Sequence, residues 1–237
     1  GDSFSAPIPR NDDVRKRAKW GAIALNKYLR LYDMEGSNVC GIDACSSEIG
    51  CRPETFATEF RYLYGCSNKT LPGKWYRTDY PHHAKLGLTY HAGEDFLDIA
   101  DGLRAIDEAI SFLELKKGDR IGHGTVLGIG VEKYYEKKRW NIYLTKQDYL
   151  DNIVWILYRS LEWNIELTSN LRESMRQEAC RYIVEIYGGI LKNREFSGYD
   201  LLDGYYESWK LRGDHPDLYR SGEYQKWKGI SAEEYDL

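Results

Sequence analysis

Hydrophobic residues along the chain recur at two spacings, one typical of amphipathic helices and one of short buried strands. The helical spacing predicts helices over residues 12–36, 53–63, 99–113 and 147–161, with a polar helical region from residue 172 onward. Short apolar runs predict strands over residues 38–44, 86–91, 118–123 and 163–167. Because strands that alternate with helices usually form a parallel sheet, we expect an α/β fold with about four strands.

Composition narrows the possible functions. The 237 residues carry a formal net charge of −4, which argues against a dominant nucleic-acid-binding surface. This net charge does not exclude a local basic patch. No apolar run approaches the length needed to cross a bilayer. Five cysteines without a Cys-x-x-Cys pair favour reduced thiols in a cytoplasmic protein. The 20 tyrosines and 7 tryptophans indicate aromatic packing in the core or at subunit contacts.

Two polar clusters follow directly on predicted strands, His91-Ala92-Gly93-Glu94 and Gly122-His123-Gly124. In a parallel α/β barrel all strands end on one face, and catalytic groups gather there. A neutral imidazole is a good zinc ligand, and a carboxylate three residues later can reach past the metal toward a substrate. The small residues beside each histidine let a metal, water or substrate approach the backbone. The two clusters therefore predict a metal-assisted hydrolytic site.

These clusters carry a family resemblance. Tyr90-His91-Ala92-Gly93-Glu94 and Asp119-Arg120-Ile121-Gly122-His123-Gly124 resemble the paired signature of the adenosine deaminase family of metal-dependent amidohydrolases. Gly41-Ile42-Asp43-Ala44 with Glu48 resembles the preceding strand of that family, which helps to shape the purine pocket. Leu167-Thr168-Ser169-Asn170 resembles the strand end that follows the second histidine. The four elements occur in the order that the family has.

The resemblance implies a Zn²⁺ cofactor and roles for individual residues. His91 would be a zinc ligand, and Glu94 would donate a proton to the purine ring nitrogen beside the reacting carbon. His123 would orient or deprotonate the zinc-bound water that attacks this carbon and expels ammonia. The resemblance also implies three substrate-binding residues: Asp43, Ser46 and Gly93.

The same resemblance implies a partial TIM-type barrel of central-to-late strands with helical insertions over residues 1–170, and a helical extension or insertion of the same domain over residues 171–237. Glu94–Ile99 and Gln147–Trp155 are similar to the large adenosine deaminase-like subunit of RADAR-type bacterial antiphage systems. Such subunits carry long insertions and work with an ATPase partner in large assemblies. We therefore expect a homo-oligomer that converts adenosine or an adenine nucleotide to the inosine form.

Two metal-binding elements of the family do not occur in this sequence. The family has a His-x-His pair on its first strand, whereas His82-His83 are adjacent and would point to opposite sides of an extended segment. Asp214-His215-Pro216 is the nearest string to the family's Asp-Asp-Pro, but it follows a helical pattern. We therefore expect the remaining ligands to lie in a larger protein. The chain alone should bind zinc weakly or not at all and should be inactive.

The sequence leaves several alternatives open. Ser46-Ser47 and Glu166-Leu167 replace the usual Gly-Asp and Cys-Pro of the family, which could change substrate choice. Residues 66–85 are either a lid beside the pocket or a surface insertion, and residues 205–227 are either a partner-binding element or intrachain packing. A non-catalytic scaffold that retains a deaminase-like barrel is the alternative function. A third possible function is another amidohydrolase reaction, such as deamination of a different base. A cytidine-type deaminase is disfavoured, because the sequence lacks the metal-ligand motifs of that class. The substrate could be a nucleoside, a nucleotide or adenine in nucleic acid.

Overall fold

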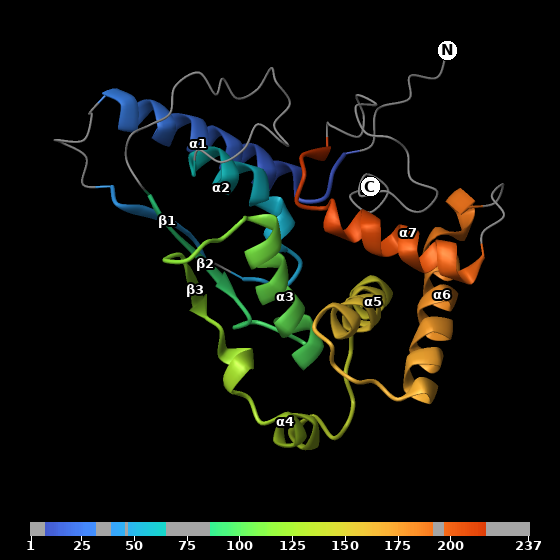
Figure 1. Cartoon of the computed structure of the whole chain (residues 1–237). Helices are drawn as coiled ribbons and strands as arrows, with labels where there is room; N and C mark the ends of the chain where they lie inside the picture. Colours follow the sequence, from blue (N-terminus) through green and yellow to red (C-terminus); the bar gives the residue numbers. More distant parts are fainter. Residues whose placement is uncertain (1–7, 32–38, 46, 65–85, 192–196, 217–237) are drawn as a thin grey trace, which may run out of the picture.

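The computed structural model describes residues 8–31, 39–45, 47–64, 86–191 and 197–216. At its centre lies a parallel sheet of three strands in the order β1-β2-β3 (Figure 1). The strands are β1 (Gly41–Ala44), β2 (Gly87–Ala92) and β3 (Arg120–His123). Three of the predicted strands and the α/β class with a parallel sheet are thereby confirmed.

Helices make up most of the described chain. They are α1 (Asp12–Leu31), α2 (Ala57–Leu63), α3 (Ile99–Phe112), α4 (Val131–Lys137), α5 (Lys146–Glu162), α6 (Ser169–Leu191) and α7 (Gly198–Lys210), with short 3₁₀ turns η1 (Pro53–Thr55) and η2 (Thr125–Gly128). Local sequence explains two of the helix starts, since Thr145 and Ser197 cap α5 and α7 by accepting from the backbone N–H three residues on. Among the described helices, none is both long and apolar enough to cross a membrane.

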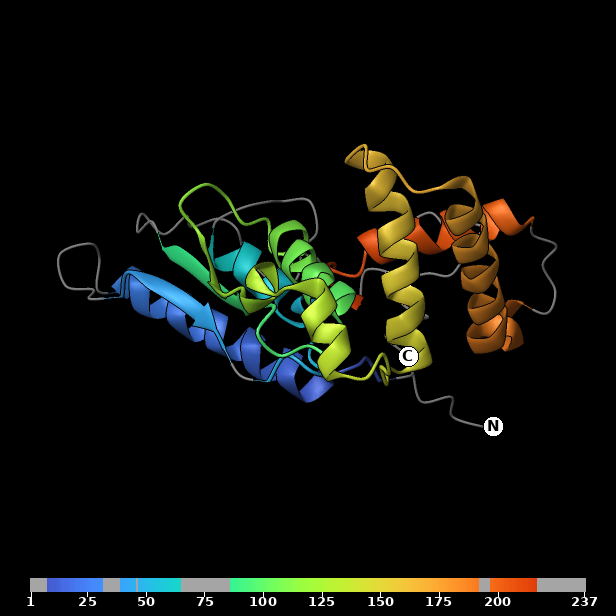
Figure 2. The ribbon, with the colours of Figure 1, turned by 90° about the horizontal axis from the view of Figure 1, so that it is seen from below.

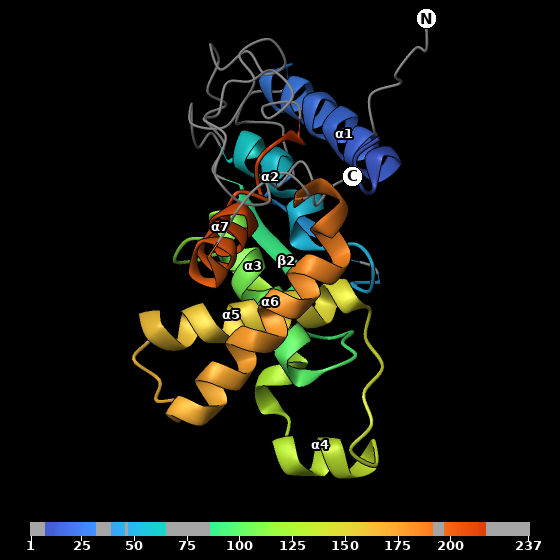
Figure 3. The same cartoon turned by 90° about the vertical axis from the view of Figure 1, so that its right-hand side faces the viewer.

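The sheet and the C-terminal helices occupy opposite ends of the molecule. Figure 2 shows α1, α2 and α3 around the sheet, with α5, α6 and α7 grouped on the other side. Helix α6 crosses α5, as the view in Figure 3 shows, and α7 packs against both. Helix α3 joins the two groups, because it contacts β2 on one side and α5 on the other.

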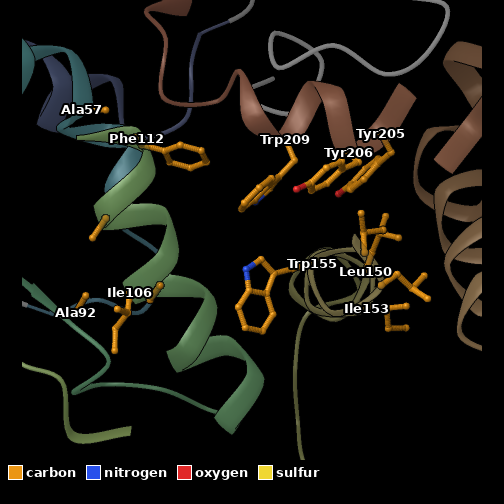
Figure 4. Packing of buried hydrophobic residues seen from close by; sticks show 14 of the residues in the cluster. Ala57, Ala92, Ile106, Phe112, Leu150, Ile153, Trp155, Tyr205, Tyr206 and Trp209 are labelled. Carbon is orange, nitrogen blue, oxygen red and sulfur yellow. The ribbon is translucent and has the colours of Figure 1, made fainter. Parts of the chain in front are cut away.

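One hydrophobic cluster runs through both groups. It includes Leu88 and Tyr90 of β2, which alternate with the less buried Thr89 and His91 as a strand with one covered face should. In Figure 4, Phe112 and Trp209 face each other across the gap between α3 and α7, with ring centroids 5.5 Å apart. The helices after residue 171 therefore share a core with the sheet.

The fourth predicted strand, residues 163–167, is wrong. These residues form an irregular connection between α5 and α6. Asn164 has a positive φ of 55° and closes the end of α5, where the amide of Ile165 donates to the carbonyl of Ser160. Trp163 and Ile165 are about half exposed, so the apolar run that resembled a buried strand lies at the surface instead. The described residues thus form an open sheet and do not close a barrel.

A buried ionic network fastens α3 to the helices around it. The Arg104 guanidinium is almost fully buried and donates to Glu108, Asp101 and Asn152. Arg52, which precedes η1, donates to the same Glu108 and Asp101. Because a buried charge is tolerated only with a partner, these ion pairs fix how η1, α3 and α5 pack together.

The same network continues to the segment after α7. Arg212 makes two hydrogen bonds to the fully buried Asp151 of α5, at 2.9 and 3.0 Å, and a third to the Tyr205 hydroxyl. Burial alone would raise the pKa of Asp151, but the guanidinium groups of Arg212 and Arg104 hold it at about 2 instead of 3.8. Asp151 therefore stays ionised and needs its arginine partners.

Replacing Arg212 with methionine should lower the free energy of unfolding by about 3–5 kcal/mol at pH 7, because Asp151 would be left buried without its main partner. Urea unfolding measures this change. Arg17→Met is the matched control, since the ion pair of Arg17 with Asp13 is exposed and should contribute less than about 1 kcal/mol.

Lowering the pH provides a second test of the same contact. Because the folded-state pKa of Asp151 is depressed, its stabilisation is present above pH 3.8 and is lost as the pH falls toward 2. The Arg212→Met protein should lose less stability over this range than the wild type. Equal stability of the two proteins at pH 7 would contradict the assigned role.

Candidate functional site

The parallel pairing of β2 with β3 brings two histidines to one edge of the sheet. His91 pairs in register with Gly122, and Ala92 pairs with His123. Both strands end at this edge, as Figure 1 shows. The imidazole centroids of His91 and His123 lie 5.0 Å apart with their planes at 60°. Two residues that are 32 positions apart in the sequence therefore share one small region, as expected of residues at a common strand edge.

Gly122 makes room for the His91 ring. A Cβ atom built on Gly122 would come within 2.7 Å of ring atoms of His91. The imidazole therefore lies directly over the neighbouring strand, and a larger residue at 122 would have to displace it. This close approach explains why a glycine, and not a β-branched residue, precedes His123 in β3.

Glu94 turns back to meet His123. The chain leaves β2 through Gly93, whose φ of +74° suits glycine and where a Cβ atom would collide with Val126 and Ile106. One carboxylate oxygen of Glu94 then lies 2.6 Å from Nδ1 of His123. The two side chains are about half exposed, so this pair faces solvent at the open edge of the sheet.

The Glu48 carboxylate holds the turn that carries Glu94. It accepts hydrogen bonds from the backbone amides of Gly93 at 2.7 Å, Glu94 at 2.9 Å and Asp95 at 3.4 Å. A carboxylate that accepts from successive amides fixes their direction and satisfies donors that the strand leaves unpaired. This role of Glu48 could not be predicted from the sequence, because a hydrogen bond between residues 45 positions apart leaves no local signal.

Asp43 of β1 lies beside His91. Its carboxylate is 3.0 Å from Nδ1 of the imidazole, so a histidine protonated at Nδ1 donates to Asp43. Asp43 was expected to bind the substrate, whereas in the structure its carboxylate contacts His91, the expected metal ligand. Gly93, another expected substrate-binding residue, is buried in the turn described above. Ser46, the third, lies outside the described residues.

The donor atoms present at this edge fit a zinc ion in their chemistry. Asp43, Cys45 and His91 each offer one ligand atom, and these atoms lie within 4.8 Å of one another. Oxygen, thiolate sulfur and imidazole nitrogen are the ligands that Zn²⁺ takes in proteins, although the same donors suit other transition metals. Cys45 was not expected as a ligand, because it belongs to none of the usual Cys-x-x-Cys motifs.

A hollow of about 300 Å³ opens next to these donors. Its lining includes Cys45, Glu48 and His91 at the sheet edge and Arg17 of α1. Its volume is at the lower end of the range for small-molecule sites. Burial raises the pKa of the Cys51 thiol on its wall, so Cys51 is a neutral thiol at pH 7.

Asp214, another candidate metal ligand, does not lie at this edge of the sheet. Asp214 is buried against Arg61, at 3.3 Å, and Arg61 also donates to the carbonyl of Phe112 at the end of α3. Helix α3 begins near the carboxyl edge of the sheet and runs back, so Asp214 lies at the end remote from His91. His82, His83 and the expected lid at residues 66–85 lie outside the described residues. The described cysteines, Cys40, Cys45, Cys51 and Cys180, are free thiols.

Comparison with known proteins gave no relative: no protein-family model and no curated protein matches this chain. The resemblance described above therefore depends on the motifs and on the geometry that their residues adopt.

Removing the Glu48 carboxylate tests how firmly the turn is held. Glu48→Ala should lower the free energy of unfolding by about 2 kcal/mol, because the amides of Gly93 and Glu94 lose a charged acceptor. The imidazole NMR signals of His123 should also shift as Glu94 moves away from it. Glu132→Ala on the exposed surface of α4 is the control and should change stability by less than about 0.5 kcal/mol. Unchanged stability and unchanged His123 signals would show that Glu48 does not position the turn.

Proposed function

We propose that the chain carries part of the site of a zinc-dependent hydrolytic deaminase that converts an adenine nucleoside or nucleotide to its inosine form. The observation that carries this proposal is the convergence of three groups at one edge of a parallel sheet. His91 and His123 are 5.0 Å apart, and Glu94 is 2.6 Å from His123. A ligand, an acid and a base within one such region are the minimum that hydrolytic removal of an amino group requires.

Glu94 and His123 would move the protons of this reaction. His123 would take a proton from the attacking water, and Glu94 would give one to the ring nitrogen next to the reacting carbon. The direct contact between Nδ1 of His123 and the Glu94 carboxylate allows a proton to pass from one to the other. Since both side chains are about half exposed, they have room to turn apart when a purine ring enters between them.

His91 would hold the metal, with its ring orientation fixed by Asp43 on one side and by the space over Gly122 on the other. A bound zinc ion would activate a water for attack by lowering its pKa to about 7. The residues at this edge thus suit the part that the resemblance gives them.

The wider expectations belong to the same proposal. A completed TIM-type barrel, a cytoplasmic homo-oligomer, an ATPase partner and a role in antiphage defence all follow from the family resemblance. The parallel sheet with its site at the carboxyl edge is consistent with such a barrel, in which strand ends carry the chemistry.

A scaffold role is the second candidate, and exposed aromatic residues favour it. Trp140 and Tyr143, between α4 and α5, are 69% and 86% exposed, and Trp163 is 51% exposed. Aromatic rings at a surface are typical of protein interfaces. An assembly subunit would use these rings without needing the groups at the sheet edge.

Deamination should depend on Glu94. In the full-length protein supplied with zinc, Glu94→Gln should lower the rate of inosine formation from adenosine or ATP by at least about 100-fold, because glutamine cannot donate the proton. The absorbance change that accompanies inosine formation measures the rate. Asp95→Asn is the matched control, since Asp95 is the exposed neighbour on the same turn and should leave the rate within about twofold.

The two proposals give different results in this assay. Comparable turnover by the wild type and Glu94→Gln would remove Glu94 from the mechanism. Absence of turnover in the zinc-loaded wild type with every adenine substrate would favour the scaffold role instead.

A further inference from the structure

We propose that Asp43, Cys45 and His91 are the protein ligands of a divalent transition-metal site at the carboxyl ends of β1 and β2. This inference deepens the proposed function and rests on it only for the choice of zinc as the metal. The binding of a metal by these three residues stands on the donor geometry alone. The proposed site would allow the chain to bind a metal although the sequence has no His-x-His pair.

The strand register explains why these residues meet. Asp43 pairs with Thr89 and Ala44 pairs with Tyr90, so the next position places Cys45 beside His91. Side chains alternate along a strand, which puts Asp43 and Cys45 on one face of β1. His91 is on the matching face of β2, because Tyr90 and Ala92 on the other face are buried in the core. Three metal-binding side chains thus project from adjacent strands in the same direction.

The distances are close to those of a bound ion. Two ligands of a tetrahedral zinc ion lie about 3.4 Å apart when both are N or O, and about 3.6 Å apart when one is sulfur. The Asp43 oxygen and the His91 nitrogen are 3.0 Å apart, and the three donor atoms are all within 4.8 Å of one another. Shifts of about 1 Å in these partly exposed side chains would complete the geometry.

The surroundings favour a site that keeps one position open. Three protein ligands leave a fourth position for water or substrate, which is the arrangement of catalytic zinc sites. The hollow of about 300 Å³ is lined by Cys45 and His91, so a small molecule in it would reach that position. The His123 ring, 5.0 Å from the His91 ring, would lie within reach of a group bound there.

Metal binding here would release protons. The Cys45 thiol must lose its proton to become a ligand, and the imidazole must be neutral. The Asp43 carboxylate would exchange its hydrogen bond with His91 for a bond to the metal. Asp43→Asn should weaken metal binding, because an amide is a poorer ligand for a transition metal than a carboxylate.

Cobalt(II) provides the direct test, because a thiolate bound to Co²⁺ gives a charge-transfer band in the near ultraviolet. The wild-type chain titrated with Co²⁺ alone should develop this band, and added Zn²⁺ should remove it. Cys45→Ser should abolish the band and lower Co²⁺ affinity by at least about 10-fold. Cys40→Ser is the matched control, since Cys40 is also an exposed free thiol just before β1 and should leave the band unchanged.

The outcomes separate this inference from the proposed function. No band in the wild type, or a band that persists in Cys45→Ser, would overturn the metal site. Inosine formation that survives Cys45→Ser would leave the proposed reaction standing while the metal site fails. A chain that binds Co²⁺ through Cys45, in a full-length protein that forms no inosine, would keep the site and overturn the reaction.

Discussion

The parallel pairing of β2 with β3 is the interaction on which the account of this protein depends. It places His91 opposite Gly122 and His123 opposite Ala92, so both imidazoles reach the same edge of the sheet. The pairing tolerates the His91 ring only because residue 122 has no side chain. A parallel pair also requires a crossover between its strands, and α3 supplies it while covering the buried face of β2. Strand pairing, core packing and the site therefore depend on one another.

Polar contacts over long sequence distances hold the surroundings in place. Glu48 fixes the turn after β2, and the buried network around Arg104 fixes α3 behind it. Arg212 extends this network to the segment after α7. These buried ions cost desolvation energy, so they specify the arrangement of the helices more than they add to stability. Glu94 and His123, which are about half exposed at the carboxyl edge of the sheet, are therefore attached to elements whose positions are fixed by these contacts.

Sequence alone predicted most of the regular elements, although not α4, and it predicted the residues that converge, but not the contacts that hold them. The spacing of apolar residues gave β2, α3 and α5 closely, and strand ends followed by polar residues indicated His91 and His123. The prediction of a strand at residues 163–167 was wrong because an apolar run does not by itself show whether its residues are buried. Asn164, with its positive φ, ends helix α5 at this point instead. The contacts of Glu48 and Cys45 were missed because their partners are distant in the chain and become neighbours only through the strand register. The buried ion pairs were missed for the same reason, since charged residues on a helix usually face solvent.

The most direct measurement is the nuclear Overhauser effect between the ring protons of His91 and His123, in a sample without added metal. The account predicts a cross-peak, because the ring centroids are 5.0 Å apart, and predicts that it disappears in His91→Gln. The contact between Phe112 and Trp209, at 5.5 Å, serves as an internal standard in the same spectrum. A spectrum with the Phe112–Trp209 cross-peak but none between the two histidines would contradict the shared edge and everything inferred from it.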